Sequence, residues 1–527
     1  MNKIGFQNFR RFTNFPELEY GGITLLVGKN NSGKSTLVKA IMLFYEYLLS
    51  GNVKQFNFSG DKLEDTNIVT FDRALNINAN KNGEKIIKFE FELSHTQFSV
   101  ELSGTENSTK ADVYNLTIIS IDGYKIEIRP QVETITVSKA NSEVENKIEN
   151  NSISEEINTL QSLIKSDKIK KSSKEYLEAV DRLNSLIDKH KTDDNQDVIL
   201  NNDQFELTTH YCDSNSIFDI IEEFISENTS KYFLSTGRDN PIDNEVDFFY
   251  DEKVDDYRAF YELRYDLSNL NSFLKIDFEE IEYYYLGASS HKQSALFAIR
   301  DKSNGLAQAI HEYKQLGIDK ATGSAAYLFV KKWMSEQFFD IGDELEITMH
   351  AGEAYEVRVS KRGVSVALAD KGMGSIQAIL LILRLACIIY KRSVDDKGDK
   401  LNPFIQMDKI LNKDKTFIII EEPELNLHPA MQSKLADLFH DVYSKFNIQL
   451  IIETHSEYLI RKTQLIVKEN EYEVIPNENP FTVIYFDTTE GQWKMNYRED
   501  GKFSNEFGSG FYDVASQQAM KLLSKAK

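Results

Sequence analysis

A glycine-rich stretch near the start of the chain constrains its fold more than any other feature. Residues 28–35 read Gly-Lys-Asn-Asn-Ser-Gly-Lys-Ser, which fits the pattern G-x-x-x-x-G-K-[ST]. An apolar run from Ile23 to Val27 precedes this pattern, and a helix-like stretch from Leu37 to Tyr47 follows it. Glycines let backbone N–H groups close around phosphate oxygens, and the helix start adds positive dipole. The sequence therefore predicts a strand, a phosphate-binding loop and a helix.

The loop also predicts a role for each of its polar residues. Lys34 is expected to reach the β- and γ-phosphates of a nucleotide, and Ser35 to ligate Mg²⁺. The alternative is an ordinary glycine–serine loop between a strand and a helix. The residues expected to contact phosphate are Gly28, Asn30, Asn31, Ser32, Gly33, Lys34, Ser35 and Thr36.

A second apolar run ends in two carboxylates. Residues 417–420 are Phe-Ile-Ile-Ile, and Glu421 and Glu422 follow directly. Buried parallel strands have this composition, and ligands of open α/β sheets bind at the carboxyl ends of such strands. We expect Glu421 to hold Mg²⁺ through water and Glu422 to orient or deprotonate an attacking water. The alternative is a buried strand with a solvated acidic end.

Two further elements could complete such a site. The strand-like run from Ile448 to Glu453 leads into Thr-His-Ser, so that His455 could contact the γ-phosphate and the attacking water. Gly372, Gly374 and Ser375 open an apolar helix and could form a second nest for anions. A structural histidine in a turn and an ordinary serine cap are the respective alternatives.

The order of these four elements resembles the ABC-type ATPase family, in the branch that includes Rad50, SMC proteins and RecF. The resemblance implies that Gly374 and Ser375 belong to the signature motif, with Glu421 and Glu422 as the Walker B pair. It makes His455 the switch histidine and residues 423–429 the D-loop. Transporter ATPases usually have Asp at the first Walker B position and Leu-Ser-Gly-Gly-Gln in the signature. Both departures are common in overcoming-lysogenization-type (OLD-related) defence ATPases.

Within that branch the chain resembles ATPases of antiphage defence operons, such as the Septu ATPase family PtuA and its retron-associated relatives. The phrases EEPELNLHPAMQ and IETHSEYLIRK carry this resemblance, which covers roughly residues 1–50 and 280–515. It implies ATP and Mg²⁺ as cofactors and a head-to-tail homodimer or higher oligomer. It also implies control of a separate HNH-type nuclease, with a retron reverse transcriptase and its RNA or DNA as further partners.

Other functions remain open at this point. A DNA-binding repair ATPase like Rad50 or RecF is one alternative, and a nucleotide-sensing scaffold with little turnover is another. The net charge of −22 disfavours extensive contact with nucleic acid. The densest basic cluster, residues 168–174, reads as a solvated helix tip or as a local nucleic-acid contact. No Asp-x-Asp follows His455, so we expect no intrinsic nuclease centre.

We expect an α/β fold: an ABC-type P-loop head with a mixed sheet, an antiparallel β subdomain and a helical insertion. Two cysteines, no signal-peptide core and no long apolar span favour a cytoplasmic protein away from the membrane. The expected divisions are a first half of the head at 1–135, a helical insertion with a coiled-coil-like hairpin at 136–280, a second half at 281–475, and a hairpin with a final helix at 476–527.

Overall fold

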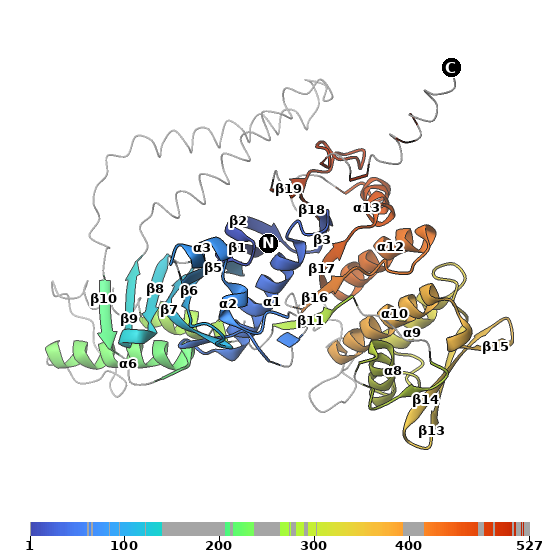
Figure 1. Ribbon diagram of the computed structural model, residues 1–527. Helices are drawn as coiled ribbons and strands as arrows, with labels where there is room; N and C mark the ends of the chain where they lie inside the picture. Colours follow the sequence, from blue (N-terminus) through green and yellow to red (C-terminus); the bar gives the residue numbers. More distant parts are fainter. Residues whose placement is uncertain are drawn as a thin grey trace, which may run out of the picture.

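The computed structural model is an α/β protein whose described residues form three sheets (Figure 1). It describes residues 2–60, 63–64, 67–83, 85–93, 95–121, 123–139, 206–210, 214–236, 264–272, 274–275, 281–288, 294–301, 303–393, 416–472, 479–488, 491–508, 511–512, 518 and 520. The predicted α/β class, with a mixed sheet and an antiparallel β subdomain, is confirmed.

A six-stranded sheet forms the centre of the molecule, in the order β11-β16-β17-β3-β18-β19. All neighbours are parallel except β18 and β19, which are antiparallel. The strands are β3 (Ile23–Gly28), β11 (Glu282–Leu286), β16 (Thr416–Glu421), β17 (Gln449–Thr454), β18 (Phe481–Phe486) and β19 (Gln492–Met495). On one side, the neighbour of the loop strand β3 is thus β17. The strand that leads into Glu421 and Glu422, β16, is separated from β3 by β17.

A larger antiparallel sheet follows the order β10-β9-β8-β7-β6-β5-β1-β2, with β4 paired to β7. Its strands are β1 (Asn2–Phe9), β2 (Phe12–Tyr20), β4 (Gln55–Asn57), β5 (Ile86–Leu93), β6 (Thr96–Ser103), β7 (Lys110–Ile119), β8 (Tyr124–Arg129), β9 (Thr134–Lys139) and β10 (Glu206–His210). Alternate side chains of β5 and β6 are buried, as the period of two in the sequence predicts.

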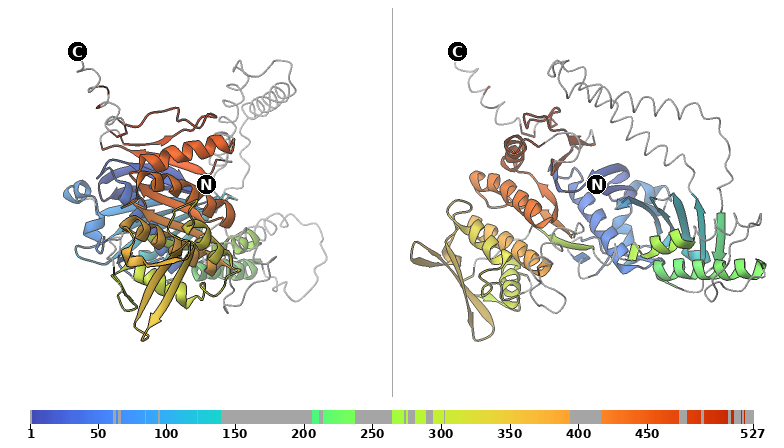
Figure 2. Two further views of the ribbon diagram at one scale, coloured as in Figure 1. Left: turned by 90° about the vertical axis from the view of Figure 1, so that its right-hand side faces the viewer. Right: turned by 180° about the vertical axis from the view of Figure 1, so that it is seen from behind.

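The helix α1 (Lys34–Ser50) lies between these two sheets (Figures 1 and 2). One hydrophobic cluster joins buried residues of α1 to Phe6 and Phe89 of the antiparallel sheet and to Ile419 of the central sheet. Ile418, the next residue of the same strand, belongs to a second cluster on the opposite face. Because successive side chains of a strand point to opposite faces, every residue of this apolar run has a core to enter.

The second cluster contains most of the remaining helices and a small sheet. The helices are α8 (Gly305–Gln315), α9 (Ala325–Met334), α10 (Met373–Arg392), α12 (Pro429–Phe446) and α13 (Glu457–Glu469). The small sheet consists of β12 (Phe297–Ala298), β13 (Glu344–His350), β14 (Ala354–Lys361) and β15 (Val364–Ala367). Short or peripheral helices in the described part of the chain include α2 (Phe71–Ala74), α3 (Ile77–Lys81) and α6 (Ile217–Thr236).

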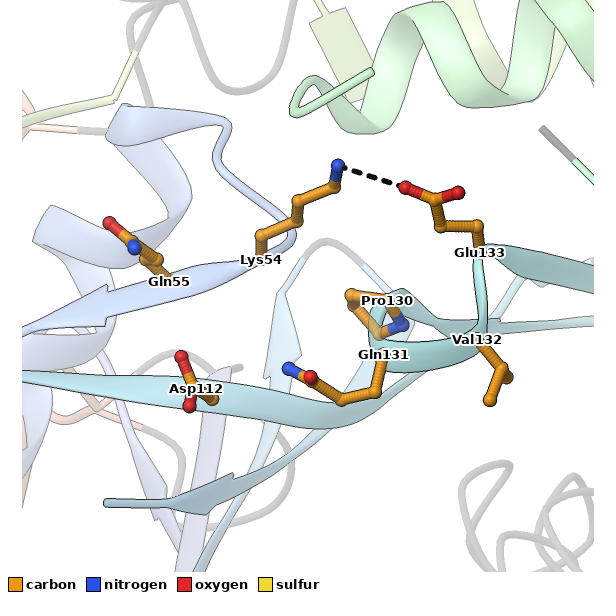
Figure 3. A pocket seen from close by; sticks show the side chains of 7 residues that line it. All are labelled: Lys54, Gln55, Asp112, Pro130, Gln131, Val132 and Glu133. Atoms are coloured by element: carbon orange, nitrogen blue, oxygen red, sulfur yellow. Dashed lines mark hydrogen bonds and ion pairs between the residues drawn. The ribbon is translucent and has the colours of Figure 1, made fainter. Parts of the chain in front are cut away.

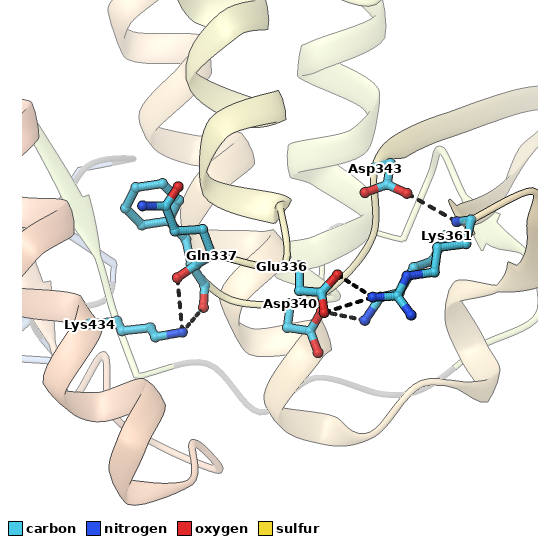
Figure 4. Close-up of polar contacts among 8 residues, drawn as sticks. Glu336, Gln337, Asp340, Asp343, Lys361 and Lys434 are labelled. Carbon is cyan, nitrogen blue, oxygen red and sulfur yellow. Dashed lines mark hydrogen bonds and ion pairs between the residues drawn. The ribbon is translucent and has the colours of Figure 1, made fainter.

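Polar contacts connect α12 to the chain that leaves α9 (Figure 4). Lys434 of α12 donates to the carbonyl oxygens of Gln337 and Phe338. Nearby, the Lys361 ammonium lies 2.5 Å from Asp340. These contacts stabilise the loop that connects the helices of the second cluster to the small sheet.

Two helix boundaries differ from the sequence prediction. The sequence predicts a helical stretch from Ala326 to Phe339, but the helix ends at Met334. Ser335 leaves helical geometry, and its hydroxyl donates to the Lys332 carbonyl oxygen. Phe339 then packs against the ring of Trp333. The sequence predicts that the apolar part of the next helix covers 378–390; α10 includes Gly374 and Ser375, ends at Arg392 and spans 20 residues.

The segment 136–280 is not helical throughout. β9 continues past residue 135, and β10 pairs with it in the antiparallel sheet, where β-branched threonines suit a pleated strand. Part of the helical insertion predicted at 136–280 is present as α6. The predicted coiled-coil-like hairpin and the basic cluster at 168–174 lie outside the described residues, as does most of the helix expected from Tyr512. The hairpin predicted at the C-terminal end is formed by β18 and β19, and β18 is a buried member of the central sheet.

By length and composition alone, α10 could cross a membrane; within the described residues it is the one helix that passes this test. Most of its residues are buried against the second cluster, and Cys387 within it is 1% exposed.

Candidate functional site

The glycine-rich loop connects β3 to α1 in the geometry that the sequence predicts. Gly33 is the residue before the helix and has φ of 114°, and Asn31 has φ of 59°. The ammonium of Lys34 donates to the carbonyl oxygens of Gly28 and Lys29, at 3.0 Å each. Burial lowers the pKa of Lys34, and the nearby carboxylates of Glu453, Glu422 and Glu424 oppose that shift.

Two glycines of the loop are required by their surroundings. Gly28 has φ of 149°, and a Cβ placed there would lie 2.2 Å from the Phe486 carbonyl oxygen on β18. A Cβ on Gly33 would lie 2.4 Å from the ring of Phe12. The loop is therefore held between the turn of β1 and β2 on one side and the end of β18 on the other.

A cavity of about 780 Å³ opens over this loop. The loop and the start of α1 line one part of it. Glu453 of β17, Glu422 after β16 and His455 after β17 line another part. The lining residues are Arg10, Arg11, Asn30, Asn31, Ser32, Gly33, Lys34, Ser35, Thr36, Arg73, Leu75, Ile77, Glu422, Glu453 and His455. The structure thus brings together most of the loop residues with the predicted Glu422 and His455.

Glu453 is the innermost carboxylate of this wall. It is 6% exposed, and its Oε1 accepts a hydrogen bond of 2.9 Å from the Ser35 hydroxyl. The same oxygen lies 3.9 Å from the Lys34 ammonium. Burial raises the pKa of Glu453 to about 7, because the attraction of Lys34 offsets only part of the desolvation and Glu421 and Glu422 add repulsion.

Glu422 and His455 face each other at the mouth of the cavity. Glu422 has φ of 45°, and its N–H donates to the Glu453 carbonyl oxygen at 2.8 Å. The His455 Nε2 lies 3.8 Å from Glu422 Oε1. Burial, and then the charge of Lys34, lower the pKa of His455 to about 4. The imidazole is therefore neutral near pH 7, and its contact with Glu422 is not an ion pair at that pH.

Glu424 supports this arrangement, although the sequence predicts it only as part of the 423–429 turn and not as a partner of His455. It is 8% exposed, and its Oε1 accepts from the His455 backbone N–H at 2.6 Å. Burial raises its pKa, while the hydrogen bond from His455 opposes the shift. Ser456 then begins α13, because its hydroxyl accepts from Leu459 N–H, and the hydroxyl also donates to Gln432 on α12. The acidic residues of the EEPE run therefore have different roles: Glu422 faces the cavity and Glu424 positions the histidine backbone.

An arginine wall, made of Arg10, Arg11 and Arg73, was also not predicted. Arg73 comes from α2, and the chain after α2 pairs with the end of β1 through a bridge between Phe9 and Leu75. The Arg10 N–H donates to the Ala74 carbonyl oxygen at 2.6 Å. No sequence pattern signals Arg73, because only this tertiary contact brings it to the cavity.

Other predicted site residues lie elsewhere. Among the described residues, Glu421 does not line the loop cavity; it lines a second cavity of about 490 Å³ with Gln377 and Arg384 of α10. Gly372, Gly374 and Ser375 form the start of α10, outside the loop cavity. A Cβ on Gly374 would lie 2.9 Å from the Asn426 carbonyl oxygen, so this helix start packs on the 423–429 turn.

A third hollow, of about 420 Å³, lies in the antiparallel sheet between β4 and the turn after β8 (Figure 3). Lys54 and Glu133 form an ion pair of 3.4 Å across it. This hollow shares no lining residue with the loop cavity.

The donor set of the loop cavity fits a nucleotide with Mg²⁺. The Oε2 of Glu453 and the hydroxyl of Ser32 are buried, and neither has a hydrogen-bond partner among the described residues. No cluster of three His, Cys, Asp or Glu side chains that could hold a metal occurs in the described part of the chain. Mg²⁺ in nucleotide sites uses one or two carboxylates, with phosphates and waters completing its shell, so the residues present suffice.

The family model described as "AAA ATPase domain" matches residues 1–460 of the chain. Among solved structures, the chain is similar to the Smc head domain with an extended coiled coil from Pyrococcus furiosus, which was solved bound to the C-terminal domain of ScpA: 12% identity, 99% of each chain covered, TM-score 0.32. For the Smc head domain with a coiled coil and joint from Pyrococcus yayanosii, the values are 11% identity, 100% of each chain and TM-score 0.33. A search among curated proteins finds no match.

Proposed function

The chain belongs to the AAA ATPase domain family, and from that premise we propose that it binds ATP with Mg²⁺ and hydrolyses it in the loop cavity. The observation that carries this proposal is the meeting of opposite groups in one cavity. Lys34 and Ser35 lie at the positive end of α1, and Glu422 and His455 face them from the strand ends. A site for phosphoryl transfer needs this combination of phosphate-binding cations and a group that orients water.

In the proposed reaction, Lys34 binds the β- and γ-phosphates, and loop N–H groups surround them. Bound Mg²⁺ would offset charge on the phosphates while they react. Ser35 is the proposed ligand on the loop side, and Glu421 is the carboxylate that the sequence nominates. Glu422 orients or deprotonates the attacking water. His455, being neutral near pH 7, can donate one hydrogen bond to a phosphate oxygen and accept one at its other nitrogen.

We also propose that a second copy completes each site. Gly372, Gly374 and Ser375 lie outside the cavity of their own chain, at the start of the 20-residue helix α10. The residue before this helix is Gly372, so no side chain caps its first N–H groups. These N–H groups and the helix dipole would favour the γ-phosphate held by a head-to-tail partner.

The biological role that we propose is control of a separate effector in a bacterial antiphage defence system. The support is the resemblance of residues 421–432 and 452–462 to defence ATPases. The proposed effector is an HNH-type nuclease, and a retron reverse transcriptase with its RNA or DNA is a further proposed partner. A Rad50- or RecF-like repair ATPase is the second candidate, and the net charge of −22 weighs against broad DNA contact.

Hydrolysis and assembly can be tested with Glu422→Gln. We expect this variant to bind ATP as the wild type does but to hydrolyse it 10²- to 10⁴-fold more slowly, because a positioned base contributes about that factor. Light scattering should then show a dimer or larger assembly trapped by ATP. Hydrolysis at the wild-type rate would assign the base to another residue, and an ATP-loaded monomer would contradict the shared site.

The biological role needs a separate measurement. Purification from the native operon should recover an HNH nuclease whose cleavage changes when ATP is added. Recovery of the chain alone, with tight DNA binding at physiological salt, would favour the repair function instead.

A further inference from the structure

Glu453 lies beside Ser35, where Mg²⁺ of the proposed site would need a carboxylate ligand. Glu453, on β17, accepts a hydrogen bond from Ser35 through Oε1, and its buried Oε2 has no hydrogen-bond partner among the described residues. Building on the proposed function, we infer that Glu453, rather than Glu421, is the carboxylate that binds Mg²⁺ beside Ser35. The sequence nominates Glu421 because it ends the strand before the water-orienting Glu422; the geometry favours the neighbouring strand.

The order of the strands places Glu453 closer to the loop than Glu421. β17 lies between β3 and β16, and the parallel register places Leu26, Glu453 and Glu421 at the same level of the sheet. Adjacent strands are about 4.8 Å apart, so the backbone at Glu421 is one full strand spacing further from the loop strand. Side chains at one level of a parallel sheet point to the same face. Glu453 therefore stands between Glu421 and the loop.

The distance between Ser35 and Glu453 suits a pair of metal ligands. Two neighbouring ligands of an octahedral Mg²⁺, each about 2.0–2.1 Å from the ion, are about 2.9 Å apart. The Ser35 hydroxyl and Glu453 Oε1 are 2.9 Å apart. No movement of the backbone is required to turn this hydrogen-bonded pair into a ligand pair, because the serine hydrogen only has to rotate away from the carboxylate.

An ion pair with Lys34 alone would not explain the second carboxylate oxygen of Glu453. Glu453 Oε1 is 3.9 Å from the Lys34 ammonium, which already donates to two carbonyl oxygens of the loop. That contact leaves Oε2 buried and without a hydrogen bond among the described residues. A carboxylate oxygen in that condition costs free energy unless a cation or a donor reaches it. Mg²⁺ bound at Ser35 would supply the missing partner.

The experiment measures how strongly Mg²⁺ strengthens nucleotide binding to the full chain. Affinity for the non-hydrolysable analogue AMPPNP is determined by calorimetry with saturating Mg²⁺ and again in EDTA, and the ratio of the two affinities is compared. We expect Glu453→Gln to reduce this ratio at least tenfold, as loss of a group that supports a metal does. Glu421→Gln, which removes the same charge one strand away, should reduce it less. If Glu453→Gln does not fold, Glu453→Asp, with its carboxylate drawn back by one methylene, gives the same comparison.

The outcomes separate this inference from the proposed function. A larger loss of the ratio in Glu421→Gln than in the Glu453 variant would overturn the inference and leave the ATPase proposal intact. A wild-type ratio near one would overturn it as well. No binding of AMPPNP by the wild type in either buffer would refute the proposed function itself.

Discussion

Replacing Glu453 by Gln should stabilise the nucleotide-free protein at alkaline pH, although it weakens the proposed metal site. Burial raises the pKa of this carboxyl from 4.5 to about 7. The folded protein therefore holds a proton that the unfolded chain releases between these two pH values. The contribution of this group to stability is greatest below about pH 4.5, falls as the pH rises to about 7, and stays low above that pH.

The size of the effect follows from the shift. At 1.36 kcal/mol per pKa unit, the raised pKa of Glu453 lowers the free energy of unfolding, relative to its value well below pH 4.5, by about 3 kcal/mol at pH 8 and by about 1 kcal/mol at pH 5. Glutamine cannot ionise and removes this dependence. The difference in unfolding free energy between Glu453→Gln and the wild type should thus grow by about 2 kcal/mol from pH 5 to pH 8. Any constant effect of the amide cancels in that comparison.

Urea unfolding in EDTA, without nucleotide, provides the assay. The two tryptophans, Trp333 on α9 and Trp493 on β19, report the second cluster and the central sheet by fluorescence. Glu344→Gln on the exposed face of β13 is the matched control, since loss of an exposed charge changes stability little. The same pH dependence of stability in Glu453→Gln and the wild type would show that the buried carboxyl does not carry this cost.

Three further changes test the site. Lys34→Ala should abolish ATP binding in calorimetry because it removes the main phosphate-binding cation; unchanged affinity would refute the loop assignment. Gly28→Ala should lower stability by about 1–3 kcal/mol in urea unfolding, since the new Cβ would lie 2.2 Å from the Phe486 carbonyl oxygen, whereas Gly323→Ala, with open space around it, should have little effect. His455, whose pKa is lowered to about 4, should give an imidazole NMR signal, identified by its loss in His455→Gln, that does not titrate between pH 5.5 and 8; a midpoint near 6.5 would contradict its burial beside Lys34.

The parts of the site that sequence predicts are those fixed by short-range geometry. A strand, a glycine-rich turn and a helix start are contiguous in the chain, so the position of Lys34 and Ser35 follows from the pattern alone. The apolar runs that became β16 and β17 could also be recognised, because both faces of a central parallel strand are buried and its sequence is continuously apolar.

The parts that sequence does not predict depend on which elements become neighbours. The sequence shows the two apolar runs that end in Glu421 and Glu453, but it does not show the order of their strands in the sheet. That order decides which carboxylate lies next to Ser35. Arg73 enters the cavity only because the chain after α2 bridges to the end of β1. Glu424 accepts a hydrogen bond from the His455 backbone, and the EEPE run shows only that a further acidic residue lies here. Its role differs from that of Glu422 because the positive φ of Glu422 turns the chain between the two glutamates.

The charges around the loop explain why such a site would respond to its ligand. Lys34 is buried beside Glu453 and close enough to Glu422 and Glu424 for all three carboxylates to affect its pKa. Arg10, Arg11 and Arg73 line the same cavity. Phosphate groups would compete with these carboxylates for Lys34. Mg²⁺ would then offset the charge of Glu453 once its contact with Lys34 is lost. Both changes act on β17, whose Glu453 carbonyl oxygen holds Glu422 and whose end leads into His455 and α13. In the proposed site, β17 would carry Glu453 beside Mg²⁺, hold Glu422 beside the water and lead into His455. Gain or loss of the γ-phosphate would therefore shift α13 and the 423–429 turn, on which the start of α10 packs.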